Sequence, residues 1–142
     1  MREGSCLCGA VRVRAALDGD GMGACHCTQC QRWTGGGPYL HVDVAEMRID
    51  GKEAVRIYRA SDWGERAFCG VCGSTLWWRM QGKPIASIAA GLLDDQSTLT
   101  VGTEIFVETR PGWLPPFEGA SQSTEAEERA KLAAFLEKEG SA

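Results

Sequence analysis

Hydrophobic and polar residues alternate with a period of two along several short stretches of the chain. This pattern is typical of strands that bury one face, because successive side chains of a strand point to opposite faces. The first such stretch lies within residues 4–17, where Val11 and Val13 are predicted to point inward. Further strands are predicted over residues 39–43, 47–50, 55–59, 75–80, 85–90 and 104–108. In the stretch over 75–80, Trp77 and Trp78 must face opposite sides of the sheet, so one is expected in the core.

Three segments do not follow this alternation. Residues 31–38 contain a glycine run and predict at most one helical turn before a loop. Residues 110–116 are rich in proline and predict an irregular arm over the surface. The tail predicts a helix, because Thr124 and Glu127 form a capping box ahead of a modest apolar face. We therefore expect one domain over residues 1–120 and a helical tail over 121–142.

Composition narrows the class of protein. The chain has 142 residues, which fits one domain, and its 18 glycines favour many turns and short strands. Its 15 basic and 19 acidic residues give a formal charge of -4 with no basic stripe, which disfavours nucleic-acid binding. The N-terminus lacks the apolar core of a signal peptide, and the weakly polar run over 85–93 is too short to span a membrane. These features predict a cytoplasmic protein without membrane partners.

The densest chemistry is the run Cys25-His26-Cys27-Thr28-Gln29-Cys30. In an extended segment Cys25 and Cys27 share a face that His26 does not, and a turn through Thr28 and Gln29 brings Cys30 to the same point. Three thiolates this close would repel one another, so a cation is their natural partner. Three ligands with no obvious fourth are typical of a reactive zinc, whereas structural zinc is normally closed by four.

The seven cysteines fall into three groups, and seven is an odd number, so disulfides alone would not use them all. Two cysteine pairs, Cys6 with Cys8 and Cys69 with Cys72, would together close a tetrahedral thiolate site and leave the trio for an open one. Two alternatives stay open at this point. Both sites would be structural if His26, His41 or a carboxylate completed the trio, and a metal-free trio would be a redox thiol cluster. Iron is also conceivable, although a single metal in tetrahedral sulfur favours zinc.

The cysteine pattern and its flanking residues resemble the glutathione-dependent formaldehyde-activating enzyme family, which shares its domain with centromere protein V. The resemblance extends to about Phe117 and includes all seven cysteines with their local spacing. Its motifs are Gly4-Ser5-Cys6-x-Cys8-Gly9-x-Val11, Cys25-His26-Cys27-x-x-Cys30, Phe68-Cys69-x-x-Cys72-Gly73-Ser74 and Ile105-Phe106-Val107-x-x-Arg110-x-x-Trp113.

The resemblance implies a mainly β fold with small zinc-stapled antiparallel sheets of the Mss4-like type and one C-terminal helix. It implies two zinc ions per chain. Cys6, Cys8, Cys69 and Cys72 would hold a structural zinc, and Cys25, Cys27 and Cys30 would hold a second, catalytic zinc. The family reaction joins formaldehyde to the thiol of glutathione to give S-hydroxymethylglutathione, in the class of carbon–sulfur lyases. No catalytic residue beyond the open zinc site is assigned.

The remaining candidates concern the substrate. Glutathione carries two carboxylates, for which Arg32, Arg79 and Arg110 are candidate partners. Trp33, Trp63, Trp78 and Trp113 are candidate walls of a pocket. Relatives often carry histidine where this chain has Glu104, so substrate choice could differ. The competing hypothesis is a zinc-stapled interaction module without catalysis, with the exposed tryptophans and the terminal helix as its partner surface. The sequence does not decide the physiological substrate or the oligomeric state.

Overall fold

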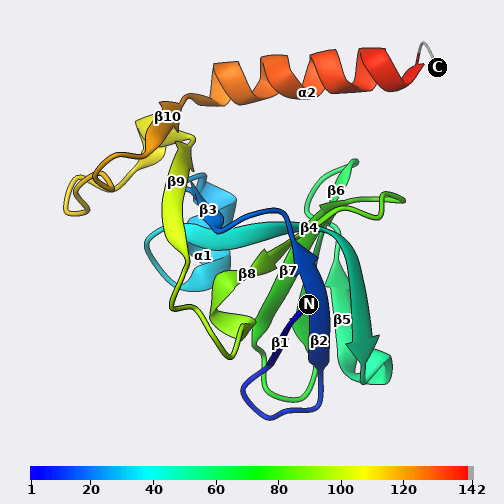
Figure 1. The fold of residues 1–142 in the computed structure, drawn as a ribbon. Helices are drawn as coiled ribbons and strands as arrows, with labels where there is room; N and C mark the ends of the chain where they lie inside the picture. The colour runs from blue at the N-terminus through cyan, green and yellow to red at the C-terminus, as the bar shows by residue number, and fades with distance from the viewer. Residues whose placement is uncertain (141–142) are drawn as a thin grey trace. The chain divides into compact units, whose positions relative to one another are not determined.

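The computed structural model describes residues 1–140, which form ten strands, two α-helices and three short 3-10 helices (Figure 1). Contacts within the chain divide it into two compact units. The first unit comprises Met1–Met22 and Leu40–Thr100, and the second comprises Gly23–Tyr39 and the chain from Val101 onward. Each group of cysteines discussed below lies within one of these units.

The first unit is an antiparallel sheet in the order β1-β2-β4-β8-β7-β6-β5. Its strands are β1 (Arg2–Ser5), β2 (Arg12–Leu17), β4 (Tyr39–Asp50), β5 (Val55–Tyr58), β6 (Gly64–Cys69), β7 (Thr75–Met80) and β8 (Ala86–Ala89). Two 3-10 helices, η1 (Lys52–Ala54) and η2 (Ala90–Leu92), lie in its connections. The two strands predicted over 39–43 and 47–50 are in fact one. Strand β4 stays continuous because it pairs with β8 at its start and with β2 along the rest.

The core of this unit follows the predicted alternation. Val11 and Val13 are buried, as expected from the first stretch, and Val42, Val44 and Ile88 join them. Trp77 is buried at 2% exposure, while Trp78 is only half-buried, so the two tryptophans do face opposite sides. Gly4 is required for backbone approach, because a Cβ at this position would overlap the carbonyl of Leu92. These apolar side chains supply the main driving force for folding of the unit.

The second unit contains most of β3 (Gly21–Cys25) and of β9 (Thr100–Ile105), together with α1 (Thr28–Thr34), η3 (Val107–Thr109), β10 (Ser121–Ser123) and α2 (Glu125–Gly140). Strand β9 lies between β3 and β10 and pairs with β10 in parallel. The pairing is therefore mixed: the strand pairs of the first unit named above are antiparallel, and β9 with β10 is parallel. The prediction of a mainly β fold with a C-terminal helix is confirmed.

Two local predictions need correction. The strand predicted over 104–108 ends at Ile105, because Phe106 adopts a left-handed conformation (φ 57°, ψ 45°) and a 3-10 helix follows. The turn predicted at Thr28 and Gln29 is the beginning of α1, which continues to Thr34 and ends where Gly35 takes φ 88°. The tail helix is confirmed, and the Thr124 and Glu127 side chains each bond to the other's backbone N–H, as a capping box requires.

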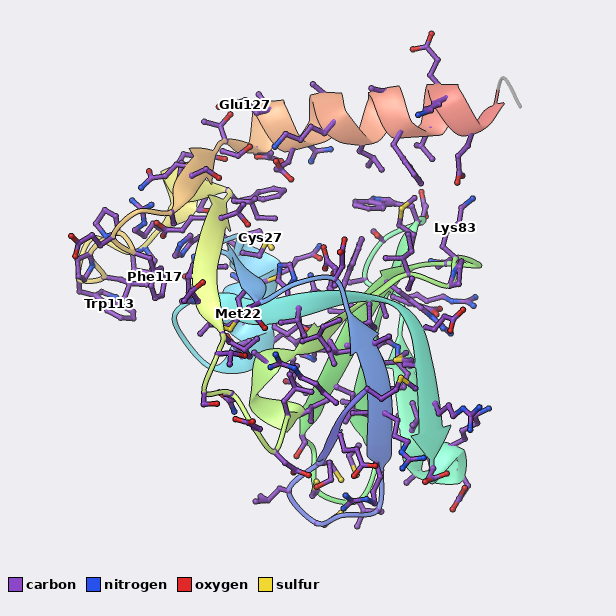
Figure 2. All side chains as sticks on the ribbon, viewed as in Figure 1. Met22, Cys27, Lys83, Trp113, Phe117 and Glu127 are labelled. Carbon is purple, nitrogen blue, oxygen red and sulfur yellow. The ribbon has the colours of Figure 1, made fainter. Side chains whose placement is uncertain are left out.

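The arm over residues 110–116 is irregular, as predicted. Trp113 and Phe117 lie close together on one side of β9, at the left of Figure 2. Along residues 1–140, the structure has no helix with the length and apolar character that crossing a membrane would require.

Candidate metal centres

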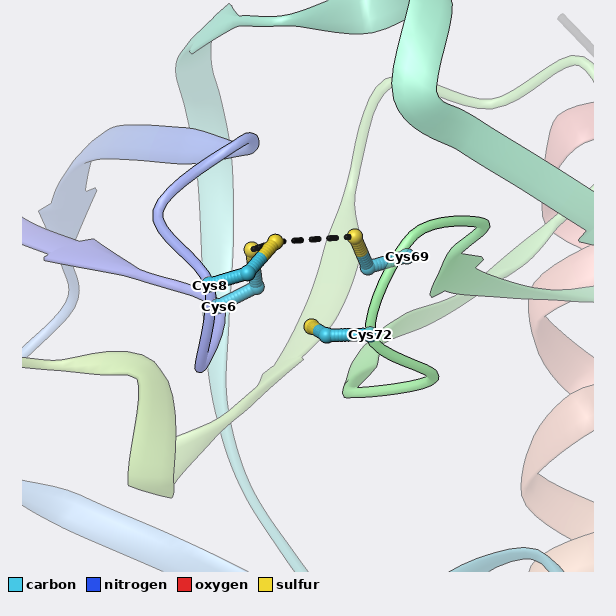
Figure 3. A group of neighbouring side chains, drawn as sticks. All are labelled: Cys6, Cys8, Cys69 and Cys72. Atoms are coloured by element: carbon cyan, nitrogen blue, oxygen red, sulfur yellow. Dashed lines mark hydrogen bonds between the residues drawn. The ribbon is translucent and has the colours of Figure 1, made fainter.

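The first cluster brings together four cysteines from two loops of the first unit. Cys6 and Cys8 lie in the loop between β1 and β2, and Cys69 and Cys72 lie at the end of β6 and in the turn before β7 (Figure 3). All four sulfurs lie within 4.8 Å of one another. The Sγ atoms of Cys6 and Cys8 are 3.7 Å apart, and those of Cys8 and Cys69 are 3.9 Å apart. The predicted grouping of these two pairs is therefore what the fold produces.

Hydrogen bonds around these sulfurs favour negative charge. The backbone N–H of Val11 donates to the Cys6 sulfur at 3.3 Å. The Ser74 hydroxyl lies 3.1 Å from the Cys72 sulfur, and with the backbone N–H groups of Ser74 and Cys8 it lowers the pKa of Cys72 to about 5. At Cys8 a hydrogen bond from the Ala10 N–H lowers the pKa, but burial and the three neighbouring thiols outweigh it and raise the pKa to about 11.

Four thiols whose sulfurs lie this close together need a cation before all can ionise together, because neighbouring thiolates repel one another. All seven cysteines of the chain are free thiols, so no disulfide relieves the crowding. A set of four sulfurs around one point matches the donor set of tetrahedral zinc or iron sites. The residues present therefore fit a metal at this position.

The second cluster lies at the junction of β3 and α1. Cys25 ends β3, Cys27 is the N-cap residue of α1, and Cys30 is in the first turn of the helix. The Cys27 sulfur accepts a hydrogen bond from the Cys30 N–H at 3.3 Å, so the cap itself draws the two side chains together. The three sulfurs lie within 4.8 Å of one another. The first turn of α1, instead of the predicted turn through Thr28 and Gln29, brings Cys30 to the other two sulfurs.

This trio is crowded and largely buried. Cys25 and Cys30 are 7% and 4% exposed, and Cys27 is half-exposed. Hydrogen-bond contacts with Cys27 and Cys30, followed by burial, raise the pKa of Cys25 well above its ordinary value. Within residues 1–140, no histidine nitrogen or carboxylate oxygen joins the three sulfurs at the same spacing. The donor set fits a metal with three protein ligands.

His26 stands between two of these cysteines but does not join them. It is fully buried, and its Nε2 lies 2.8 Å from Oε1 of Glu104 on β9. Its backbone N–H donates to the Ile105 carbonyl at 3.0 Å. Its own carbonyl accepts hydrogen bonds from Gln31 Nε2 at 2.7 Å and Thr109 Oγ1 at 2.8 Å. His26 therefore attaches the trio to the segment that contains β9 and η3.

Glu104 is a fully buried carboxylate that is saturated with donors. Its Oε1 accepts from His26 and from Arg110 Nη2 at 3.1 Å, and its Oε2 accepts from the Phe117 N–H at 3.0 Å and Gln122 Nε2 at 3.4 Å. Burial raises the pKa of Glu104, but these hydrogen bonds and the Arg110 charge outweigh it and lower the pKa below its ordinary value. The sequence marked Glu104 only as a departure from relatives. The one local indication that Glu104 would be paired was Arg110, its ion-pair partner six residues later.

Comparison with known proteins places this chain in a family. Residues 1–109 match the family of the glutathione-dependent formaldehyde-activating enzyme. The chain belongs to this family. The match covers both cysteine clusters and Glu104, so the two candidate centres belong to the region that defines the family.

Two named relatives and one solved structure extend the comparison. A protein of Halomonas elongata, named as a proposed glutathione-dependent formaldehyde-activating enzyme, is 32% identical in an alignment of 128 positions that covers 80% of each chain. An uncharacterized lyase of Schizosaccharomyces pombe is 29% identical over 111 residues, 77% of this chain and 80% of that one. The fold resembles a crystal structure of a Rhodobacter sphaeroides protein with a TM-score of 0.58 at 19% identity, covering 86% of this chain and 99% of the other.

For a member of the glutathione-dependent formaldehyde-activating enzyme family, the arginines predicted to bind substrate carboxylates are weak candidates. Arg110 is bound to Glu104, and Arg79 donates to the buried Glu65 carboxylate at 2.8 Å. Arg32 is exposed on α1, but it follows Cys30 by two residues, which places it about 200° around the helix from that cysteine. None of the three is brought to the trio by contacts within its own unit.

The tryptophans divide between packing and exposure. Trp33 on α1 packs against the buried Tyr39, with ring centroids 4.9 Å apart. Trp63 and Trp78 meet edge to face at 5.4 Å. Trp113 is 71% exposed on the arm. Trp33 is the one candidate wall that shares an element with the trio, since α1 also contains Cys30.

Proposed function

We propose that this protein is a zinc-dependent carbon–sulfur lyase that acts on the adduct of a small thiol with formaldehyde. The thiol is glutathione, and the product of the joining direction is S-hydroxymethylglutathione. In that direction the sulfur forms a bond to the aldehyde carbon, the carbonyl π bond breaks, and the proton from the thiol ends on the new hydroxyl. Membership of the family and the names of its relatives support this proposal.

The observation that carries the proposal is the three-sulfur cluster of Cys25, Cys27 and Cys30. We propose that these residues hold a catalytic zinc, and that Cys6, Cys8, Cys69 and Cys72 hold a structural one, two zinc ions per chain. Zinc with an open position keeps a thiol deprotonated at neutral pH and polarises a carbonyl oxygen. Four sulfurs would fill all four coordination positions of a zinc ion, whereas the trio leaves the fourth position for a substrate.

The residues around the trio hold these three sulfurs in place before substrate arrives. Cys27 caps α1 and fixes the first turn in which Cys30 lies. Gln31 and Thr109 bind the His26 carbonyl, which joins this turn to η3. Burial of Cys25 and Cys30 excludes water from the inner side of the cluster, and the half-exposed Cys27 leaves an approach for a small thiol. A site fixed in advance loses less free energy in ordering its ligands.

The test is Cys30→Ser, with Cys69→Ser as the contrasting variant. We expect Cys30→Ser to fold, to lose turnover, and to release one of two zinc ions more readily. Cys69→Ser should instead fail to fold, because it opens the structural site. Zinc per chain is counted by native mass spectrometry, and turnover is the enzyme-dependent exchange between formaldehyde and its glutathione adduct, followed by NMR. Full activity in Cys30→Ser would overturn the open-site mechanism.

A zinc-stapled interaction module is the second candidate function. Trp113 is 71% exposed, and Phe135 and Leu136 on α2 are 40% and 47% exposed, so apolar surface is available to a partner. This function predicts a stable complex recovered with the protein from cells. A purified protein that recovers no partner and accelerates the exchange reaction would exclude it.

A further inference from the structure

The strongest unexplained feature of the second unit is a carboxylate buried without exposure beside the three-cysteine cluster. A charge in this position is costly unless it is fully paired, and removal of its partners is costlier still. Glu104 meets that requirement with donors from four residues: His26, Arg110, Phe117 and Gln122. Three of these donors belong to residues that follow β9 in the chain, and the fourth, His26, lies between Cys25 and Cys27.

His26 is the link between this carboxylate and the trio. The segment from Glu104 to Thr109 holds His26 at three points: the side chain through Glu104, the backbone N–H through Ile105, and the carbonyl through Thr109. The peptide groups on either side of His26 lead directly to Cys25 and Cys27. Fixing His26 at these points therefore fixes the spacing of two of the three sulfurs.

The imidazole ring of His26 has one hydrogen-bond partner among the described residues. Among the described residues its Nδ1 is buried and finds no hydrogen-bond partner, so the contact from Nε2 to Glu104 alone sets the ring orientation. Because Oε1 of Glu104 is an acceptor already shared with Arg110, Nε2 carries the proton in this contact. An outer carboxylate that orients a histidine is a common device around metal ligands, although His26 here is a neighbour of the ligands and not one of them.

We infer that Glu104 is the positioning residue of the three-cysteine metal site, acting through His26 on the loop that contains Cys25 and Cys27. This inference rests on the proposed function, because it takes the trio to hold a metal. It assigns Glu104 no contact with substrate. It also gives a physical role to the glutamate by which this chain departs from its relatives: the Glu104 carboxylate accepts hydrogen bonds from His26 and from Arg110.

The test is Glu104→Gln in the full zinc-loaded protein, with Glu108→Gln as the matched control. Glutamine keeps the shape of the side chain but removes the charge and turns an amide N–H₂ toward one set of donors. Glu108 lies on the same segment, and its carboxylate accepts the Glu125 N–H at 2.8 Å, but it is exposed and bonds to α2 instead of His26. The two variants therefore differ in which element loses its acceptor.

Zinc transfer to a chromophoric chelator gives the readout. In Glu104→Gln we expect one of the two zinc ions to leave about 10- to 100-fold faster, the usual effect of losing an outer partner. The other zinc should leave at the wild-type rate, which shows that the fold is intact, and Glu108→Gln should match wild type in both. In the cobalt-substituted protein, the visible absorption of the faster site should shift in Glu104→Gln alone, which a purely structural role would not produce.

Three results would overturn the inference, and they are distinguishable. Wild-type release and an unchanged cobalt spectrum in Glu104→Gln would overturn it alone and leave the proposed function standing. Equal acceleration of both zinc ions would show that Glu104 acts on general stability instead of on the trio. A wild-type protein that holds only one zinc would overturn both the inference and the proposed function.

Discussion

At the scale of single residues, Ser74 joins the two halves of the four-cysteine cluster. Its hydroxyl accepts the Leu7 N–H at 3.0 Å and lies 3.1 Å from the Cys72 sulfur. We predict that Ser74→Ala destabilises the zinc-loaded protein by about 1 kcal/mol, the typical contribution of one hydrogen bond. It should also accelerate zinc release from this cluster about 10-fold, since the serine is an outer partner of a ligand. Thermal unfolding and transfer to a chelator measure the two effects.

Ser61→Ala is the control for this change. The Ser61 hydroxyl accepts the Gly64 N–H at 3.0 Å, so its loss removes a hydrogen bond of the same kind. Ser61 lies outside the cysteine motifs, since the next cysteine in the chain is Cys69. We expect a similar loss of stability and no change in the rate of zinc release. Equal zinc release from Ser74→Ala and wild type would contradict the bridging role.

The sequence predicted the members of each cysteine pair and of the trio because these depend on local spacing, and it joined the two pairs, which are 61 residues apart, because a closed thiolate site needs four ligands. Each pair is separated by one or two residues, so its members meet in any loop that the chain forms there. The contact between His26 and Glu104 joins residues 78 apart in the chain. No local pattern specifies such a contact, and the same holds for Gln122, which reaches Glu104 from β10. The supporting network of the trio was therefore beyond what spacing alone could supply.

At the scale of elements, strands with clear alternation were predictable and their ends were not. β7 begins and ends where the pattern placed it, at Thr75 and Met80, because apolar burial fixes its register. The end of β9 depends on Phe106, a residue whose left-handed backbone conformation is not signalled by its type. Helix α1 was underestimated because its N-cap is a cysteine, which is not among the usual capping residues.

The extent of the tail is a prediction that the structure allows us to sharpen. Strand β10 pairs with β9, Ser123 is buried, and Gln122 donates to Glu104, so the residues from 121 to 123 support the site. The side chains of α2 are mostly exposed. We predict that removing residues 125–142 changes the free energy of unfolding by less than about 1 kcal/mol, because exposed pairs contribute little, and leaves both zinc ions bound.

Removing residues 121–142 should behave differently. It breaks the β9–β10 ladder and takes a donor from a buried carboxylate, for which we expect a loss of about 2 to 3 kcal/mol and faster release of one zinc. Denaturant unfolding and native mass spectrometry of both truncated proteins measure this. Equal behaviour of the two would place the boundary before β10, at residue 120.

At the scale of the whole molecule, metal loss is expected to have different consequences at the two clusters. The four-cysteine cluster ties the β1–β2 loop to the turn after β6, which are distant in sequence, whereas the trio spans six residues at one junction. Binding of a structural zinc contributes about 10 to 16 kcal/mol to small metal domains, and an ordinary domain is stable by about 5 to 15 kcal/mol. Losing the metal of the first cluster is therefore expected to unfold the chain, and losing that of the trio is not.

Titration with a chelator of increasing strength tests this division. In a variant whose other four tryptophans are replaced by phenylalanine, we predict that the first zinc leaves with unchanged far-ultraviolet circular dichroism and unchanged emission from the buried Trp77, because the trio can lose its ion and keep α1 and β3. The second zinc should leave together with the loss of both signals, since the β1–β2 loop and the turn after β6 are then no longer joined. Cys30→Ser should lose the first zinc to a weaker chelator and show an unchanged second step. A single step in which both ions leave as the chain unfolds, or a chain that stays folded without either, would contradict the assignment of one structural and one open site.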